Sequence, residues 1–380
     1  MKKGLFTMNH TLKENRLFFG VRFPKGKKEG VRLYDAAGLN AAVGTDKESA
    51  ENDFDKFMPW SEMRRCNTMK VGAERIPTRY QGNDGFTNTE EDVFVYVPRF
   101  YYSRTYNAKG DEIVKVCSDP FEGGDVPRKF KRADGTIRSF VFLAAYTAGV
   151  KDGRLVSRAG LEPFSTSLNG FMKLTETLDD LRIESTLDDE IKNVLLDVEF
   201  ATRDPQSIMA GAVSSDRVWD SGACDSVLSS SGSPGDNSSG KFPCIWRGVE
   251  NPWGNTFRFR WNVLVKDRVP YILGDPAKYA RGEVTEDYIP LDYKLSRHDG
   301  WAHKLGFDER FPDVQIPVEV ADSYEESAFG CYFWQWSEGI YTLRVGGYVH
   351  YTRYAGARSC YVNNAPSSSS WLYCAALSPA

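Results

Sequence analysis

The chain has 380 residues, with 48 Lys and Arg against 52 Asp and Glu, and a formal net charge of -4. This balance provides no broad positive field to hold nucleic acid or an acidic membrane surface. No apolar run approaches the roughly 20 residues that span a bilayer, and the first ten residues lack the apolar core of a signal peptide, so we expect cytoplasmic synthesis and no membrane insertion.

The length suits one large domain with a small appendage. Residues 17–32 mix aromatic and β-branched residues with Gly and Pro, which predicts short strands joined by a basic turn. Residues 35–55 are polar and small and predict a linker or an extended arm. We therefore expect a β-rich N-terminal segment, 1–54, for oligomerisation or attachment, and a main domain over 55–380.

The first half of the main domain is expected to be mostly strand. Ser61 is placed to cap one turn of helix within Phe57–Cys66, with Glu62 near its start. Strands are predicted over Asp92–Tyr102, Ile113–Cys117 and Ser139–Tyr146. Pro98 indicates that the second half of the first strand lies on a sheet edge or bends away.

Helix signals are few. A short helix is predicted over Thr175–Leu181, and a clearer one over Leu187–Thr202, whose acidic start suits the positive end of the helix dipole. The apolar residues that fall on one face of the second helix are Ile191, Val194, Leu195 and Val198.

The segment from Ser214 to Gly240 is rich in Ser, Gly and Asp and predicts a long surface loop. Three tryptophans follow closely and indicate the centre of the core: Trp246, Trp253 and Trp261. The seven cysteines are dispersed without a Cys-x-x-Cys pair, which argues against a disulfide framework and a structural zinc site. Most should be small buried hydrophobes, although Cys224 and Cys244 could form a bridge.

Catalytic signatures are missing. No phosphate loop, dinucleotide fingerprint or Gly-x-Ser-x-Gly elbow occurs, so we expect no enzyme and no catalytic residue. His298 and His303 are five residues apart, which is not the spacing of a helical zinc pair. Asp299, Asp308 and the Asp-rich stretch 216–236 keep a calcium site conceivable, and calcium is the one cofactor left open.

The last 42 residues, Gly339–Ala380, have an unusual composition. They contain no Lys, Glu, Asp, Gln or Met, and at the chain average of 26% charged residues they should carry about 11 charges. Only Arg344, Arg353 and Arg358 are present. Tyr, Ser, Asn, Gly, Cys and Trp take their place, which is the mixture that antibody loops use for contact. The tail is therefore predicted to be a binding surface.

Several segments resemble the variable proteins of diversity-generating retroelements, a family that includes phage receptor-binding proteins of the major-tropism-determinant type. These segments are Glu250–Asn255, Leu343–Gly347, Ala355–Ser359 and Asn363–Ser370. Three earlier segments resemble stretches common in phage and prophage tail proteins: Met58–Asn67, Val97–Tyr102 and Val198–Asp204. Together the resemblance covers residues 55 to the C-terminus.

The resemblance implies an α+β C-type lectin fold of the formylglycine-generating-enzyme type, strand-rich with few helices. It also implies a homotrimer at the tip of a phage tail fibre, assembled with other tail proteins, that recognises a host cell-surface protein or glycan. Display on a bacterial cell surface is the alternative location.

In this family, template copying with errors at adenines diversifies the gene. Errors in the first two bases of an Asn codon give most amino acids but never Lys, Glu, Gln, Met or Trp. Four of these five are absent after Glu338, and the exception, Trp371, is assigned to the fixed scaffold. The codon rule does not explain the absence of Asp.

The family pattern, matched residue by residue, separates variable positions from scaffold positions. The ligand-binding, variable positions are Tyr348, His350, Tyr351, Tyr354, Tyr361, Asn363, Ser368, Ser370, Leu372 and Tyr373. The scaffold positions are Trp253, Gly346, Gly347, Gly356, Arg358, Pro366, Trp371 and Ala375. Cys360 and Cys374 stay ambiguous.

Three alternatives remain open. A calcium-dependent carbohydrate-binding lectin would need Glu-Pro-Asn or Gln-Pro-Asp sugar motifs, and both are missing. An oxidase of the formylglycine-generating type would need a catalytic cysteine pair, for which Cys331, Cys360 and Cys374 lack the expected context. The tail could also be an aromatic strand pair in the core, but runs of Ser and Asn are expensive to bury.

Overall fold

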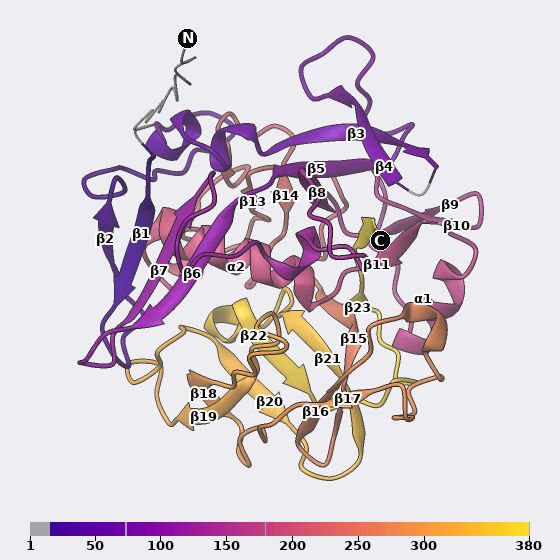
Figure 1. Cartoon of the computed structure of the whole chain (residues 1–380). Helices are drawn as coiled ribbons and strands as arrows, with labels where there is room; N and C mark the ends of the chain where they lie inside the picture. The colour runs from indigo at the N-terminus through magenta and orange to yellow at the C-terminus, as the bar shows by residue number, and fades with distance from the viewer. Residues whose placement is uncertain (1–15, 73, 179, 380) are drawn as a thin grey trace, which may run out of the picture.

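The computed structural model describes residues 16–72, 74–178 and 180–379. Over these residues the chain is strand-rich with two α-helices, which confirms the predicted α+β class with few helices. Figure 1 shows two sheets of the first half of the chain in the upper part and the sheet of the second half below them. Helix α2 (Thr186–Phe200) lies between these two parts and contacts β1, β7 and β15.

The first sheet joins the N-terminal segment to the main domain. Its strands, in spatial order, are β2 (Val31–Tyr34), β1 (Phe19–Phe23), β7 (Glu112–Cys117) and β6 (Tyr101–Tyr106). The strands predicted within 17–32 are thus confirmed, and β1 pairs with β7 along its whole length. Residues 1–15 lie outside the described residues, and the boundary at residue 54 stays a prediction.

The second sheet is also antiparallel. Its order is β4 (Glu74–Tyr80), β3 (Arg64–Val71), β5 (Val93–Pro98) and β8 (Phe140–Ala144). Pro98 is the last residue of β5, after which the chain bends away and continues as β6 at the edge of the first sheet. The expectation from Pro98 is therefore confirmed, because proline cannot donate to a continuing ladder.

The second half of the chain forms a nine-stranded sheet. Eight strands follow in the order β17 (Ile289–Pro290), β16 (Val269–Ile272), β15 (Phe257–Lys266), β21 (Ile340–Gly346), β22 (Gly356–Val362), β20 (Tyr332–Gln335), β18 (Gly300–Leu305) and β19 (Pro317–Ala321), and β23 (Tyr373–Cys374) pairs with β15. All residues of β15 except Lys266 are buried, so this strand is the centre of the sheet.

Shorter elements complete the fold. The small sheets are β9 (Gly149–Lys151) with β10 (Arg154–Val156), β11 (Leu181–Ile183) with β24 (Leu377–Pro379), and β12 (Ser231–Gly232) with β13 (Ile245–Trp246) and β14 (Val249–Glu250). The 3-10 turns are η1 (Asp53–Lys56), η2 (Trp60–Glu62), η3 (Arg128–Phe130), η4 (Pro205–Ser207), η5 (Pro276–Lys278) and η6 (Thr352–Tyr354).

Two helix predictions are wrong in detail. The short helix is α1 (Leu168–Thr175), so it ends where the sequence analysis placed its start. Its start is fixed by Ser167, whose hydroxyl accepts a hydrogen bond from the Gly170 amide at 3.1 Å. Ser61 lies inside η2 and does not cap it, because Pro59 holds the preceding position.

Helix α2 confirms the longer helix prediction. Ser185 and Asp188 form a capping box at its start, and Asp188 and Asp189 provide the acidic first turn. Its four predicted apolar residues are buried in the core that α2 shares with the first two sheets. The helix ends at Ala201, which adopts a left-handed conformation with φ 52°.

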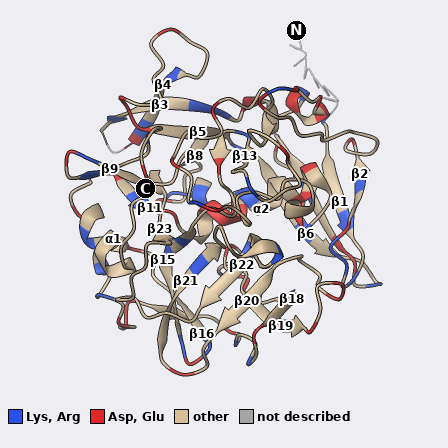
Figure 2. Ribbon diagram, turned by 180° about the vertical axis from the view of Figure 1, so that it is seen from behind, with Lys and Arg blue, Asp and Glu red and all other residues tan. Residues whose placement is uncertain are grey.

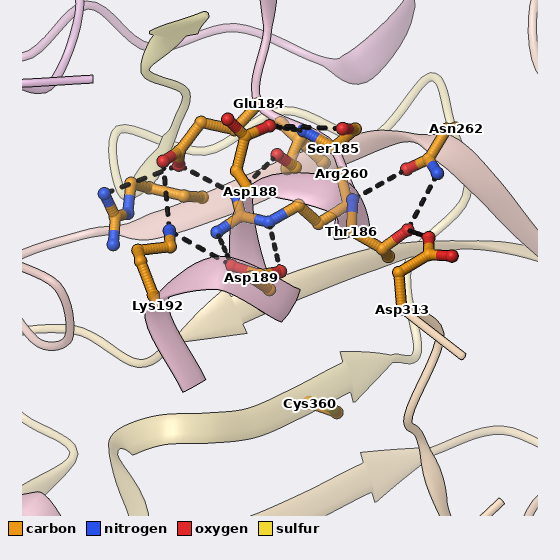
Figure 3. Close-up of polar contacts among 12 residues, drawn as sticks. Glu184, Ser185, Thr186, Asp188, Asp189, Lys192, Arg260, Asn262, Asp313 and Cys360 are labelled. Atoms are coloured by element: carbon orange, nitrogen blue, oxygen red, sulfur yellow. Dashed lines mark hydrogen bonds and ion pairs between the residues drawn. The ribbon is translucent and has the colours of Figure 1, made fainter. Parts of the chain in front are cut away.

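The polar side of α2 is buried as well. Asp189 accepts two hydrogen bonds from the Arg260 guanidinium at 2.6 and 2.7 Å, and Lys192 donates to Glu184 at 3.0 Å (Figure 3). Arg260 lies 3.1 Å from Glu184 as well. Figure 2 shows the acidic residues of α2 at the centre of the molecule, with basic residues close by. Burial opposes ionisation, but Lys192, Arg260 and Arg258 together lower the pKa of Glu184.

Further contacts tie α2 to other parts of the fold. They are Asp188 with Lys129 of η3, Asp197 with Arg358 of β22, Glu190 with Tyr102 of β6, and Glu199 with Arg247 and Trp246. Buried ion pairs hold only when every charge has a partner. Because these partners come from different sheets, α2 fixes where the sheets stand relative to one another.

The loop and core predictions hold with one correction. Trp246, Trp253 and Trp261 are buried, as expected. All seven cysteines are buried and free, so Cys224 and Cys244 form no bridge. The segment 214–240 is mostly irregular, but it is not a simple surface loop, because several of its serines pack inward.

We predict that Glu184→Ala lowers the free energy of unfolding by about 3–5 kcal/mol, because it leaves buried cations without their carboxylate. Urea denaturation measures this loss. The control is Glu319→Ala, which breaks an exposed pair with Lys304 and should cost at most about 1 kcal/mol. Equal losses in the two variants would contradict the structural role of the buried network.

A second prediction concerns pH. Burial, and next the nearby Asp313, raise the pKa of Glu190 to about 7. A raised carboxyl pKa adds stability that is complete below the unfolded value near 4.5 and is lost as the pH rises through 7. The free energy of unfolding should therefore fall by about 1–2 kcal/mol between pH 5.5 and pH 8.

Chemical denaturation across that pH range checks the effect. Glu190→Gln should flatten the curve, because the glutamine cannot ionise. Glu250, whose pKa burial also raises to about 7, should leave a residual slope in that variant. A wild-type curve that rises from pH 5.5 to pH 8 would contradict this assignment.

Candidate binding surface

The tail runs through the middle of the nine-stranded sheet. It forms β21, a loop over 347–355, β22, a second loop over 363–372 and then β23. Gly346 and Gly347 begin the first loop with φ values of 91° and 82°, which favour glycine. A Cβ atom on Gly347 would lie 2.6 Å from Ala355 Cβ. The local backbone therefore favours glycine at both positions, which the sequence analysis assigned to the scaffold.

Three tyrosines of the first loop lie beside one another. The ring centroids of Tyr348 and Tyr351 are 4.3 Å apart, and those of Tyr351 and Tyr354 are 6.3 Å apart. Two successive turns of three-residue spacing bring their rings into this series: the Tyr351 amide donates to the Tyr348 carbonyl and the Tyr354 amide to the Tyr351 carbonyl, both at 3.0 Å. Tyr348 and Tyr351 pack on Phe257 of β15, at 5.1 and 5.3 Å.

The series continues into residues outside the tail. Tyr354 stacks on Trp301 at 5.2 Å and contacts the edge of Tyr332 at 4.8 Å. Tyr332 in turn lies 4.9 Å from Trp334. We call this set the aromatic surface; its members are the partly exposed Tyr332, Trp334, Tyr348, Tyr351 and Tyr354 together with the buried Trp301.

Trp301, Tyr332 and Trp334 are not among the predicted site residues. A signal existed for β20, because Tyr332 and Trp334 alternate with Phe333, which is buried in the core of the sheet. An alternation of period two places Tyr332 and Trp334 on the opposite face. No comparable signal exists for Trp301, which reaches the tail only through the sheet order.

The aromatic surface offers polar groups as well as rings. Tyr354 is 40% exposed, His350 is exposed, and Tyr348 and Tyr351 are half-buried. Within the described residues, the hydroxyls of Tyr348, Tyr351 and Tyr354 have no hydrogen-bond partner. A tyrosine with a packed ring and an unpaired hydroxyl can contribute both apolar area and a hydrogen bond to a ligand.

Tyr361 differs from its predicted role. Its side chain is 1% exposed and lies 4.5 Å from Phe257 and 5.2 Å from Tyr351. Its hydroxyl donates to the Tyr354 carbonyl at 3.2 Å. Tyr361 therefore supports the exposed rings from beneath and does not itself reach a ligand.

Asn363 and Tyr373 anchor the second loop. The guanidinium of buried Arg344 lies 4.0 Å from the centre of the Tyr373 ring and donates to Asn363 Oδ1 at 2.8 Å. Tyr373 donates its hydroxyl to Asn364 Oδ1 at 3.1 Å. Burial lowers the pKa of Arg344. The Asn363 side chain therefore points toward Arg344 at the base of the loop. This position differs from the ligand contact that was predicted for it.

The remaining predicted positions lie on the second loop. Ser368 and Ser370 are half-buried, and their hydrogen bonds stay within this loop. The Leu372 carbonyl accepts a hydrogen bond from the Phe257 amide at 3.1 Å, and Leu372 is half-buried. These three residues lie close in sequence to Tyr373, whose ring contacts Phe257, as do the rings of Tyr348 and Tyr351.

The two scaffold tryptophans differ. Trp253 is fully buried and donates its indole N–H to the Met209 carbonyl at 3.0 Å, as a scaffold residue should. Trp371 is 60% exposed on the second loop, so packing does not explain a fixed position. Its large exposed ring is available for contact beside Ser370 and Leu372.

The first loop stores backbone strain. Thr352 has φ 50°, a left-handed conformation that is unfavourable for a β-branched residue. Two hydrogen bonds hold it there: its amide donates to the Val213 carbonyl at 2.8 Å, and Gln206 Nε2 donates to its carbonyl at 2.8 Å. Such strain persists only when the surroundings determine the conformation, and it is typical of functional loops.

A polar hollow of about 290 Å³ adjoins this loop. Thr352, Arg353 and Tyr324 line one side, and serines of the 207–240 region line the other. Tyr324 contacts Trp301 at 5.1 Å, so the hollow continues the aromatic surface. Burial raises the pKa of Asp204 in this hollow to about 6, and its carboxylate accepts the Tyr324 hydroxyl.

The arrangement of the described side chains disfavours a metal site and a reactive cysteine. Across residues 16–72, 74–178 and 180–379, no three His, Cys, Asp or Glu side chains are grouped to hold a metal. Asp308 pairs with Arg310, and Asp299 accepts the Gln335 amide. Burial raises the pKa of Cys360 to about 12 and that of Cys331 well above its usual range, which disfavours a reactive thiolate.

Comparisons with known proteins do not assign this chain to a family. No protein-family model matches the chain, and no curated protein matches it. Among the described residues, no helix has the length and apolar character needed to cross a membrane.

We predict that Thr352→Gly raises the free energy of unfolding by about 1 kcal/mol, because glycine adopts the left-handed conformation without strain. Thr105→Gly in strand β6 is the matched control and should destabilise the protein, since Thr105 has no positive φ. Urea denaturation of both variants provides the comparison. A destabilised Thr352→Gly variant would show that the loop is not strained.

Proposed function

We propose that the protein is a ligand-binding protein diversified by a retroelement, and that it acts as a phage or prophage tail receptor-binding protein. Its tail would bind a host cell-surface protein or glycan. The observation that carries the proposal is the series of Tyr348, Tyr351 and Tyr354 across the sheet, with unpaired hydroxyls. The same surface on a bacterial adhesin would bind in the same way.

The burial of tail residues supports the division into variable and fixed positions. Tyr348, His350, Tyr351 and Tyr354 lie at the surface, where substitution changes contacts without opening the core. Arg358 instead reaches into the core and donates to Asp197 of α2 at 2.7 Å. A site that varies in sequence requires this separation between exposed side chains and the frame that holds them.

The C-type lectin fold is part of the proposal. Two helices, short strands and long irregular loops are compatible with it, as is the pairing of the last strand, β24, with β11 between the helices. In such a fold, a rigid sheet displays irregular loops, so that substituted side chains change which ligand is bound while the backbone stays the same.

The chemistry of the aromatic surface sets the expected binding mode. Packed tyrosines lose little conformational entropy on binding and act as anchors, while neighbouring serines contribute little. A homotrimer on a tail fibre, with other tail proteins, would engage several receptor copies at once and convert a weak site into tight attachment.

A glycan-binding lectin is the second candidate. The polar hollow beside the exposed rings favours it, because aromatic faces with adjacent hydroxyls and Arg353 suit a sugar. Calcium dependence would distinguish this candidate, since chelation would abolish calcium-mediated sugar binding and leave direct aromatic contact intact.

The test is cell binding by fluorescently labelled protein, measured by flow cytometry on bacterial strains that the wild type stains. Replacing Tyr348, Tyr351 and Tyr354 with Ala should reduce binding at least about tenfold, as expected for loss of aromatic anchors. Phe307→Ala removes an exposed aromatic ring elsewhere and should leave binding unchanged. Unchanged staining by a folded triple variant would contradict the proposal.

A further inference from the structure

A second candidate site lies away from the aromatic surface. Two adjoining hollows of about 350 and 190 Å³ open beside β4, β8, η3 and the end of β24. They share Lys129, Arg138 and Pro379 as lining residues. None of the residues that line them belongs to the aromatic surface.

The charge of these hollows differs from that of the whole chain. Eight Lys and Arg line them, against three Asp and Glu, whereas the chain as a whole is acidic. The eight cations are Lys70, Arg75, Arg128, Lys129, Lys131, Arg132, Arg138 and Arg182. Concave walls with one sign of charge concentrate a ligand of the opposite sign.

Most of these cations already have carboxylate partners. Arg75 makes a two-pronged pair with Asp180 at 2.9 Å, and Arg132 pairs with Glu74. Lys129 is fully engaged with Asp188, Ser378 and the Phe142 carbonyl. These pairs shape the walls and leave little capacity for a ligand.

Arg138 and Arg182 are different. Within the described chain neither has a carboxylate partner, and both line the smaller hollow. Arg138 donates one N–H to the Lys129 carbonyl at 3.1 Å, and Arg182 donates to the Leu178 and Leu181 carbonyls. Each guanidinium therefore keeps further N–H donors for an anion.

The surroundings of Arg138 favour such an anion. Burial, and next the neighbouring Arg132, lower the pKa of Arg138. An oxyanion bound to the Arg138 guanidinium would offset the repulsion from Arg132 and replace hydrogen bonds to water that burial removes. Trp261, Ile183 and Pro276 line the smaller hollow as well and provide apolar wall next to the charge.

We propose that these hollows bind a small organic oxyanion, a sugar or similar body that carries a phosphate or sulfate group. Arg138 and Arg182 hold the anionic group through their free N–H donors, and the apolar wall contacts the body. No lining residue of the site belongs to the aromatic surface, so substitutions at Tyr348, Tyr351 and Tyr354 would leave it in place. Arginine suits this role, because its planar fork matches phosphate and sulfate geometry.

Isothermal titration of the full chain tests the proposal with glucose 6-phosphate, glucose 6-sulfate and glucose as probes. At least one of the two anionic sugars should bind with a stoichiometry of one, and glucose should not. The anionic sugar that binds more tightly shows whether the site prefers a phosphate or a sulfate group. Affinity should fall as salt rises, since charge carries the recognition.

Arg138→Gln and Arg182→Gln should each weaken binding at least about tenfold, as expected for loss of charged hydrogen bonds. Arg138→Lys keeps the charge without the fork and should give an intermediate affinity. Arg297→Gln, an exposed arginine outside the hollows, is the matched control and should bind as the wild type does. Thermal unfolding confirms that each variant is folded.

No binding of either anionic sugar, or equal affinity in wild type and folded Arg138→Gln, would overturn the proposal. Because cell binding through the aromatic surface is measured separately, failure of this site leaves that function unaffected.

Discussion

Helix α2 is the element on which the rest of the fold depends, because its charged side chains are buried and matched from several directions. Asp189 pairs with β15, Asp197 with β22 and Glu199 with Arg247 beside β13. Each charge would be costly without its partner, so the sheets must stand where the partners meet. The apolar side of the helix adds ordinary core packing against the first two sheets. Specific pairing and close packing thus act on the same fifteen residues.

This arrangement separates what holds the fold from what faces outward. Arg358 lies in the tail but belongs to the α2 network, whereas the side chains of Tyr348 and Tyr354, also in the tail, pack against other aromatic rings. Tyr361 and Phe257 lie between, as the packed layer on which the outer rings rest. Changes in the outer layer therefore leave the ion pairs untouched. A protein that must bind new partners without refolding needs such a division.

The sequence predicted local features well and long-range ones poorly. Helix α2 followed from its apolar period and acidic start, and the three core tryptophans from their density. The burial of Tyr361 could not be predicted, because its place under Tyr351 depends on the pairing of β22 with β20 and β21. The contact of Trp301 with Tyr354 could not be predicted either, because it depends on the pairing of β18 with β20. The inward packing of the serine-rich loop likewise depends on contacts between segments far apart in the chain.

The central claim is that the exposed part of the tail was made by template copying while the frame stayed fixed. The DNA that flanks the gene tests it most directly. The account predicts a near-copy of the codons for Gly339–Ala380 beside a reverse transcriptase gene, with differences only at adenines of the copy. Those differences should include Tyr348, His350, Tyr351 and Tyr354 and spare Gly346, Gly347 and Arg358. A copy whose differences fall on other bases or on the buried frame, or flanks without any copy, would contradict it.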